Sequence, residues 1–219
     1  MTPILYIGNR NYSSWSLRPW LVLRWSDTEF ETRVVPLGGP GYGEKQLASV
    51  LAISPTGTVP ALHIGPEVVV DSLAISEWAA EQNRSLWPAD PVARAYARSA
   101  VCEMHSGFGA IRSQLPCNIR RRTPAREWQP DVCRELARIE SLWTQLRTRF
   151  GSNGPYLFGA RSIADAFFTP VATRLRTYSI KLGSEAQGYA DTLLADPAFR
   201  EWEGLALQET WTLPQWDAV

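Results

Sequence analysis

The stretch TVPALHIGPEVVVDSLAISEWAAEQ, Thr58–Gln82, holds two apolar runs separated by a tight turn and followed by a longer segment of helical character. Turn residues at Gly65–Pro66 between the two apolar runs predict a β-hairpin. Ser72 is a natural N-cap residue, and the apolar positions between Leu73 and Ala80 predict a helix over Asp71–Gln82. This part of the chain is therefore predicted to run strand, strand, helix.

The residues before this stretch predict a strand, a helix and a second strand. Ile4–Gly8 is a short apolar run that ends in glycine, which is typical of a buried strand. Ser14–Ser26 predicts a helix in which Pro19 comes early enough to be tolerated. Glu29–Leu37 predicts the second strand, and a strand–helix–strand unit of this size implies a parallel pair with a right-handed crossover. Residues 1–82 are thus expected to form one α/β domain.

After Gln82 the pattern changes. Residues 83–92 contain two prolines and little periodicity, which predicts a linker. No strand is predicted beyond it, so residues 93–219 are expected to form an all-helical domain. The predicted helices are Val92–Leu115, Pro130–Phe150, Ser162–Tyr178, Ala186–Ala195 and Pro197–Gln208.

Composition narrows the class of protein. The 219 residues carry no net charge, and a protein that binds nucleic acid usually has a basic surplus. The three cysteines are odd in number and form no CxxC pair, which argues against a disulfide framework, a zinc site or a dithiol redox motif. With only two histidines as well, we expect no metal. The glycine-rich Gly38–Gln46 lacks the GxxxxGK[ST] pattern and is predicted to be a surface loop.

No apolar run approaches the roughly 20 residues of a membrane span. The N-terminal residues MTPILYIGNR lack the basic region of a signal peptide. Together with the reduced setting that unpaired cysteines favour, this predicts a soluble cytoplasmic protein without a membrane partner.

Three motifs, in this order and at these separations, resemble the glutathione S-transferase family: TVPAL (58–62), DSLAISEWAAE (71–81) and SIADAFFTPV (162–171). A fourth, SSWSLRPW (13–20), resembles the SSCSWR signature of the zeta class. The resemblance covers essentially the whole chain. It implies a thioredoxin-like N-terminal domain (βαβ-ββα, with a mixed four-stranded sheet), a helical C-terminal domain, a homodimer, and glutathione as co-substrate.

The resemblance also implies roles for named residues. The Val59–Pro60 peptide bond would be cis, and the Val59 backbone would pair with the cysteinyl part of glutathione. Asp71 and Ser72 would hold the γ-glutamyl end, where the helix N-terminus favours an anion. The Ser162–Asp165 stretch is an S-x-x-D capping box, for which we expect a structural role.

In this family a hydroxyl near the first helix contacts the glutathione sulfur. A free thiol is only about 3% ionised at pH 7, and lowering its pKa by two units requires about 2.7 kcal/mol. Matching SSCSWR assigns the role to Ser13, whereas counting back from Arg18, as in other serine-type classes, assigns it to Ser14. Tyr12 is a third candidate, and Trp15 stands where the signature has cysteine.

The pocket for the second substrate is expected in the helical domain. His105, Phe108 and Arg112 recur at near-helical spacing and could share a face, where Arg112 could bind an anionic co-substrate. A structural histidine and a solvated arginine are the alternatives for the two polar residues. Arg174 and Arg176 fall near the substrate-carboxylate site of zeta enzymes, although their spacing from Pro170 fits poorly. The expected pocket residues are Tyr12, Trp15, His105, Phe108 and Arg112.

Three functions agree with these motifs. The first is a glutathione transferase that activates the thiol for attack on a small electrophile. The second is a non-catalytic module of the same fold that binds a ligand or a protein. The third is a cis–trans isomerase like maleylacetoacetate isomerase, against which count Trp15 in place of cysteine and Thr58 in place of the usual glutamine.

Overall fold

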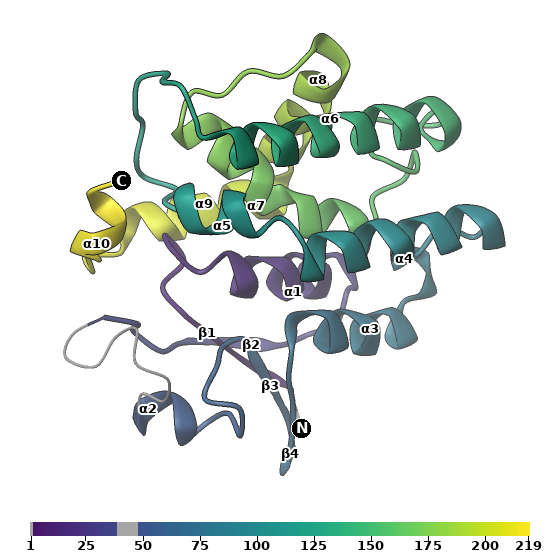
Figure 1. The fold of residues 1–219 in the computed structure, drawn as a ribbon. Helices are drawn as coiled ribbons and strands as arrows, with labels where there is room; N and C mark the ends of the chain where they lie inside the picture. Colours follow the sequence, from purple (N-terminus) through teal and green to yellow (C-terminus); the bar gives the residue numbers. More distant parts are fainter. Residues whose placement is uncertain (1, 39–47) are drawn as a thin grey trace.

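The computed structural model describes residues 2–38 and 48–219. One mixed sheet lies at the bottom of the view in Figure 1, with helices stacked above it. The strand order is β2-β1-β3-β4; β1 runs parallel to β2 and antiparallel to β3, and β3 and β4 form an antiparallel hairpin. The predicted mixed four-stranded sheet is confirmed. The strands are β1 (Ile4–Ile7), β2 (Glu31–Val34), β3 (Ala61–Ile64) and β4 (Glu67–Val69).

Two helices cover the upper face of this sheet, α1 (Ser14–Trp25) and α3 (Ser72–Gln82) (Figure 1). Leu5 and Leu62 are fully buried and belong to the same core cluster as Leu21 of α1. Alternate residues of a strand face opposite sides, so the apolar run of β1 gives the helices an apolar surface to pack on. This packing fixes the start of α1 above the end of β1.

The helical part surrounds α7, nearly all of whose residues are buried. Helix α7 packs against α1, α4 and α8. It therefore joins the helical part to α1, one of the two helices that cover the sheet. The remaining elements are α2 (Ala48–Leu51), the 3-10 helix η1 (Arg84–Leu86), α4 (Pro91–Ser106), α5 (Gly109–Gln114), α6 (Pro130–Phe150), α7 (Ile163–Thr177), α8 (Ser184–Ala195), α9 (Pro197–Gln208) and α10 (Pro214–Asp217).

The prediction of one helix over Val92–Leu115 is wrong, because the chain breaks between α4 and α5. Phe108 adopts a left-handed conformation (φ 59°) that buries its ring, which is 6% exposed. A side chain at Gly107 would come within 2.8 Å of the Glu103 carbonyl oxygen. Spacing alone could not show this break, since the periodicity continues on both sides of it.

Three short elements were not predicted: α2, η1 and α10. The first and last have four residues each and no periodic pattern to read. The predicted linker over 83–92 contains η1, and its bounds stay a prediction. The predicted glycine-rich loop lies outside the described residues beyond Gly38. Within the described ranges no helix is long and apolar enough to cross a membrane.

Candidate active site

Ser13 is the N-cap of α1. Its hydroxyl oxygen accepts a bond from the Ser16 amide (3.3 Å), and the hydroxyl donates to the Ser16 hydroxyl (2.8 Å). Ser16 in turn accepts from the Gly8 amide (3.1 Å), so a short chain of bonds ties the helix start to the end of β1. The Ser13 side chain is therefore engaged in capping.

Ser14 is the first residue of α1, and its oxygen accepts a bond from Nη2 of Arg174 (3.3 Å). Arg174 comes from the central helix α7, where its other nitrogens donate to the carbonyls of Leu115 and Pro170. The hydrogen of the Ser14 hydroxyl has no acceptor among the described residues. A neighbouring guanidinium makes such a hydroxyl a stronger donor toward an anion.

Two arginines pack against the ring of Trp15. The Arg18 guanidinium carbon lies 4.4 Å from the ring centroid and that of Arg112 lies 4.6 Å from it. Arg18 is 1% exposed and also lies over Phe167 (4.9 Å), yet its Nε and Nη1 have no hydrogen-bond partner among the described residues. Arg112 donates to carbonyls at the end of α4, including that of His105 (3.2 Å).

The charges of this arginine cluster (Arg18, Arg112 and Arg174) oppose one another. Burial lowers the pKa of Arg18 well below its usual range, and the neighbouring Arg112 and Arg174 lower it further. Burial likewise lowers the pKa of Arg112 to about 10 and lowers that of Arg174. The nearby Asp71 carboxylate acts in the opposite direction and raises the pKa of Arg18. An anion in this place would relieve both the desolvation and the repulsion.

The start of α3 supplies two polar side chains. Asp71, not Ser72 as predicted, is the N-cap: its Oδ1 accepts from the amides of Leu73 (2.9 Å) and Ala74 (3.1 Å). Its Oδ2 lies 3.0 Å from Nε2 of His105, whose ring meets that of Trp15 edge-on. Ser72 is fully buried, and its hydroxyl has no partner among the described residues.

The Val59–Pro60 peptide bond is cis, as the resemblance implied. Pro60 precedes β3, whose Ala61 pairs with Tyr6 near the end of β1. The cis bond therefore lies beside the end of β1, from which the chain leads to Ser13. The backbone of Val59 thus borders the same region as the starts of α1 and α3.

The site thus gathers several candidates predicted from sequence: Ser14, Trp15, Asp71, His105 and Arg112. Tyr12 lies elsewhere, because its hydroxyl bonds Asp217 of α10 (3.0 Å). The ring of Phe108 belongs to the core cluster. Arg176 pairs with Glu203, away from the cluster.

The sequence did not show that Arg18 would be a buried cation with open donors. Its place four residues after Ser14 puts both on one helix face, and this spacing was the available signal. The spacing of Arg174 from Pro170 fits the substrate-carboxylate site of zeta enzymes poorly. Its guanidinium nevertheless donates to the Ser14 hydroxyl oxygen. Among the described residues no group of three or more histidine, cysteine or acidic side chains could hold a metal ion.

Comparison with known proteins relates the chain to glutathione S-transferases. Residues 12–82 match the model for the N-terminal domain of glutathione S-transferases. Maleylacetoacetate isomerase of Pseudomonas aeruginosa is 28% identical over 209 residues, which cover 90% of this chain and 93% of that protein. The N-terminal part of this chain is thus a glutathione S-transferase N-terminal domain. A probable maleylacetoacetate isomerase of Caenorhabditis elegans is 34% identical over 108 residues, about half (48%) of either chain.

Solved structures of the family share the fold. A glutathione transferase homologue from Burkholderia, solved with bound glutathione, superposes with a TM-score of 0.72 at 20% identity, covering 95% of this chain and all of that one. A diazinon-metabolizing glutathione S-transferase of the silkworm Bombyx mori gives a TM-score of 0.71 at 19% identity, covering 95% and 98%. At this identity the likeness concerns the fold: a thioredoxin-like domain followed by helices.

Proposed function

We propose that the protein is a glutathione transferase that activates the glutathione thiol at Ser14 for attack on a small electrophile. The observation that carries this proposal is the Ser14 hydroxyl, which accepts from buried Arg174 and keeps its own hydrogen to donate. Ser13, the other serine candidate, donates its hydroxyl hydrogen to the Ser16 hydroxyl. A donor at the N-terminus of α1 favours the thiolate over the thiol.

Glutathione is the expected co-substrate, and no metal is needed. The start of α3 offers the buried Ser72 hydroxyl to the γ-glutamyl carboxylate. The Asp71 carboxylate, which caps α3 through Oδ1 and lies beside His105 through Oδ2, is proposed to attract the ammonium group. The Burkholderia relative described above has glutathione bound, which supports the same ligand here. The Val59 backbone beside the cis bond is the proposed partner of the cysteinyl amide groups.

The chemistry follows from this placement. The thiol loses its proton to solvent, and the Ser14 hydroxyl donates a hydrogen bond to the sulfur anion. The sulfur lone pair forms a bond to the electrophilic carbon, and the leaving group departs with the bonding electrons. Trp15 is the large exposed apolar side chain beside this position, so it is proposed to form a wall of the second-substrate pocket. His105 and Arg112 flank it.

Two measurements test this function. Titration calorimetry should show glutathione binding, and an aryl halide should be conjugated at a rate that depends on glutathione. Binding without turnover on any electrophile would favour the second function, a non-catalytic binding module. The absence of glutathione binding would refute the transferase and leave only a module of the same fold that binds another ligand or a protein.

A cis–trans isomerase is the second candidate function, and one observation favours it. Arg18 and Arg174 of the arginine cluster are buried near Ser14, and Arg18 holds open donors, which suits a substrate carboxylate. The P. aeruginosa relative is a maleylacetoacetate isomerase. Here the thiolate would add to a double bond, allow rotation and leave again. Incubation with maleylacetoacetate and glutathione, with chromatographic detection of the fumaryl isomer, decides whether this activity is present.

The resemblance further supports two proposals about the protein's state. We infer that the protein is a homodimer. A sedimentation mass near the 24.5 kDa of one chain at micromolar concentration would refute this. We also infer a cytoplasmic location, which fractionation of the source cells would test.

A further inference from the structure

The loop that joins β1 to α1, residues 8–13, is held by parts of the chain that are distant in sequence. The Asn11 carbonyl accepts from the Ile119 amide (3.1 Å), and its side-chain oxygen accepts from the Arg120 amide (2.9 Å). Its side-chain nitrogen donates to Asn118 (3.0 Å). The loop that leads into Ser13 and Ser14 thus depends on nonlocal contacts.

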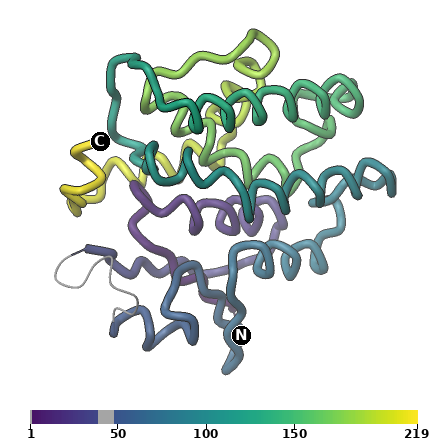
Figure 2. The backbone as a smooth tube through the Cα atoms, viewed as in Figure 1, coloured from purple at the N-terminus to yellow at the C-terminus, as the bar shows by residue number. Residues whose placement is uncertain are grey.

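The C-terminal segment, residues 209–217, binds the other side of this loop. Figure 2 shows the yellow end of the chain beside the first turn of purple backbone. Glu209 is 9% exposed, and its two carboxylate oxygens accept from the amides of Arg10 (2.9 Å) and Asn11 (3.2 Å). One side chain therefore fixes two consecutive peptide groups, which restricts the backbone more than a single bond would.

Tyr12 is the second anchor of the C-terminal segment. Its hydroxyl donates to the Asp217 carboxylate (3.0 Å) and accepts from the Leu213 amide (3.2 Å) and from Nη2 of Arg120 (3.3 Å). Asp217 also accepts from Asn118 (2.6 Å). Tyr12 immediately precedes Ser13, the N-cap of α1. The bonds of the Tyr12 hydroxyl therefore hold the residue next to the start of this helix.

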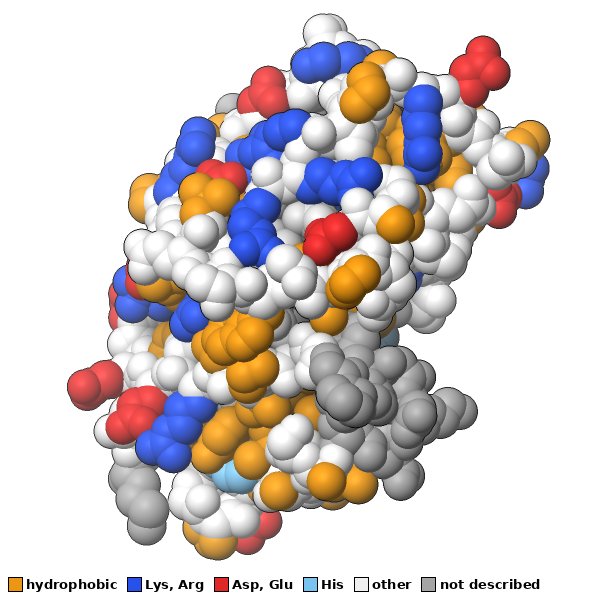
Figure 3. All heavy atoms as spheres, turned by 90° about the vertical axis from the view of Figure 1, so that its left-hand side faces the viewer, with side chains coloured by type: hydrophobic (Ala, Val, Ile, Leu, Met, Phe, Trp, Pro, Cys, Tyr) orange, Lys and Arg blue, Asp and Glu red, His pale blue; other side chains and the backbone are white. Residues whose placement is uncertain are grey.

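The surface around Glu209 favours a carboxylate at this position. Figure 3 looks at this side of the molecule, where lysine and arginine side chains gather over the upper half and hydrophobic ones lie below them. Arg10 pairs with Glu209 (3.5 Å), and Arg120 donates to the carbonyls of Glu209 and Trp211. A carboxylate on the C-terminal segment thus meets both positive side chains and backbone amides, and each bond is charge-assisted.

We propose that the C-terminal segment is a positioning element of the active site: Glu209 and Tyr12 hold the β1–α1 loop so that the Ser14 hydroxyl meets the glutathione sulfur. This inference rests on the proposed function. Neither side chain touches the reacting atoms, and both act through the backbone that leads into α1. A displacement of about 1 Å at a reacting group can cost on the order of a hundredfold in rate.

The test uses Glu209→Gln and Tyr12→Phe in the full-length chain. Glutamine keeps the size of Glu209 but places an NH₂ group against one of the two amides, so one bond becomes a clash of donors. Tyr12→Phe removes only the hydroxyl. The readouts are the absorbance of the glutathione thiolate against pH in the complex, and kcat and KM for glutathione.

We expect the pKa of the bound thiol to rise by about one unit in Glu209→Gln, for example from about 6.5 to about 7.5, which lowers the thiolate fraction and with it kcat at pH 7 about threefold. KM for glutathione should change by less than about twofold, and the rates should converge with those of the parent above pH 9, where the thiol ionises unaided. Tyr12→Phe should shift the titration in the same direction and by less.

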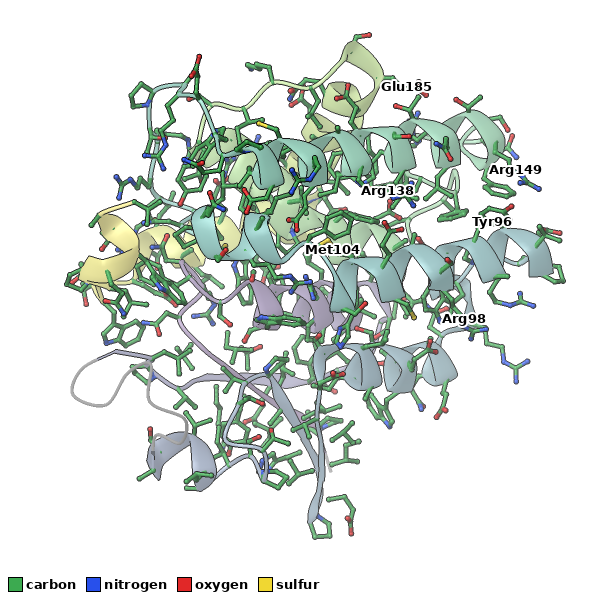
Figure 4. All side chains as sticks on the ribbon, in the orientation of Figure 1. Tyr96, Arg98, Met104, Arg138, Arg149 and Glu185 are labelled. Atoms are coloured by element: carbon green, nitrogen blue, oxygen red, sulfur yellow. The ribbon has the colours of Figure 1, made fainter. Side chains whose placement is uncertain are left out.

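The matched control is Tyr96→Phe. The Tyr96 hydroxyl accepts from Arg149 of α6 (2.8 Å), and Figure 4 places both residues on the side of the molecule opposite α10. Tyr96→Phe removes the same phenolic oxygen as Tyr12→Phe does, and the thiolate titration of this control should equal that of the parent. Asp217→Asn is the milder second variant if Glu209→Gln unfolds, and it should shift the titration as Tyr12→Phe does.

The outcomes separate this inference from the proposed function. If the parent protein binds no glutathione, or leaves its thiol at the free pKa, the proposed function fails. If the parent lowers the thiol pKa and the folded variants titrate like it, the positioning role is overturned. A lower melting temperature with an unchanged titration overturns it too, since the C-terminal segment would then contribute stability alone.

Discussion

The starts of α7 and α3 carry the same kinds of side chain and differ in how those side chains are satisfied. At α7, the Asp165 carboxylate accepts from the amides of Leu157 and Ser162 and from both the Ser162 and Tyr189 hydroxyls. The predicted capping box is confirmed. At α3, the equally buried Ser72 hydroxyl has no partner among the described residues.

This difference separates a structural site, the start of α7, from the proposed binding site at the start of α3. A buried polar group without a partner costs about 1–3 kcal/mol, so a protein retains one where something else repays the cost. The start of α7 is closed within the chain and can only stabilise it. The start of α3 and the neighbouring Arg18 keep donors open, which is what a polar or anionic ligand requires.

The largest effect on free energy is expected at the start of α7. Asp165→Ala leaves two amides and the Tyr189 hydroxyl buried without their acceptor, so it should lower the free energy of unfolding by about 3 kcal/mol or more. Denaturant unfolding measures the loss, and the turnover number per folded molecule should be retained. An unchanged stability with a collapsed turnover would place Asp165 in the active site instead.

The next effect is expected at Ser14. Ser14→Ala removes the proposed donor to the sulfur, so the pKa of bound thiol should rise toward about 8.5. Conjugation at pH 7 should slow by tens-fold, the equivalent of up to about 2.7 kcal/mol, and should approach the parent rate above pH 9. Rates over this pH range measure it. A pH profile identical to that of the parent would transfer the role to another donor, such as a backbone amide.

Ser72→Ala tests the open site directly. Losing a hydroxyl that grips the γ-glutamyl carboxylate should weaken glutathione binding by about 1.5–3 kcal/mol, measured by calorimetry. The ligand-free protein should not lose stability, because the hydroxyl has no bond there to lose. Ser162→Ala is the matched control: it should lower the melting temperature and leave glutathione affinity alone. Unaltered affinity in Ser72→Ala would remove this residue from the site.

The smallest effect is expected at Ser13. Ser13→Ala removes one capping bond and should cost about 1 kcal/mol of stability. The bond from Gly8 to Ser16 still ties the helix start to β1, so the thiolate titration should remain close to that of the parent. A titration shift as large as that of Ser14→Ala would restore Ser13 as the catalytic serine.

Most of the secondary structure could be predicted because it depends on local patterns. The bounds of α6 (Pro130–Phe150) and α9 (Pro197–Gln208) agree with the prediction to the residue. Each begins with proline at its first position, where the missing amide costs nothing. The α4–α5 break was missed because a left-handed Phe108 leaves no mark on apolar spacing.

The sequence by itself determined the order of the strands and of most of the longer helices, the capping box and the list of polar residues from which a site could be built. Only the tertiary structure decided which of them act together. It separated Tyr12 from the site by binding its hydroxyl to Asp217, and it brought Arg174 to Ser14 across 160 positions. The physical reason is that periodicity and capping reflect neighbours within a few residues, whereas a guanidinium finds its partners through the packing of whole helices.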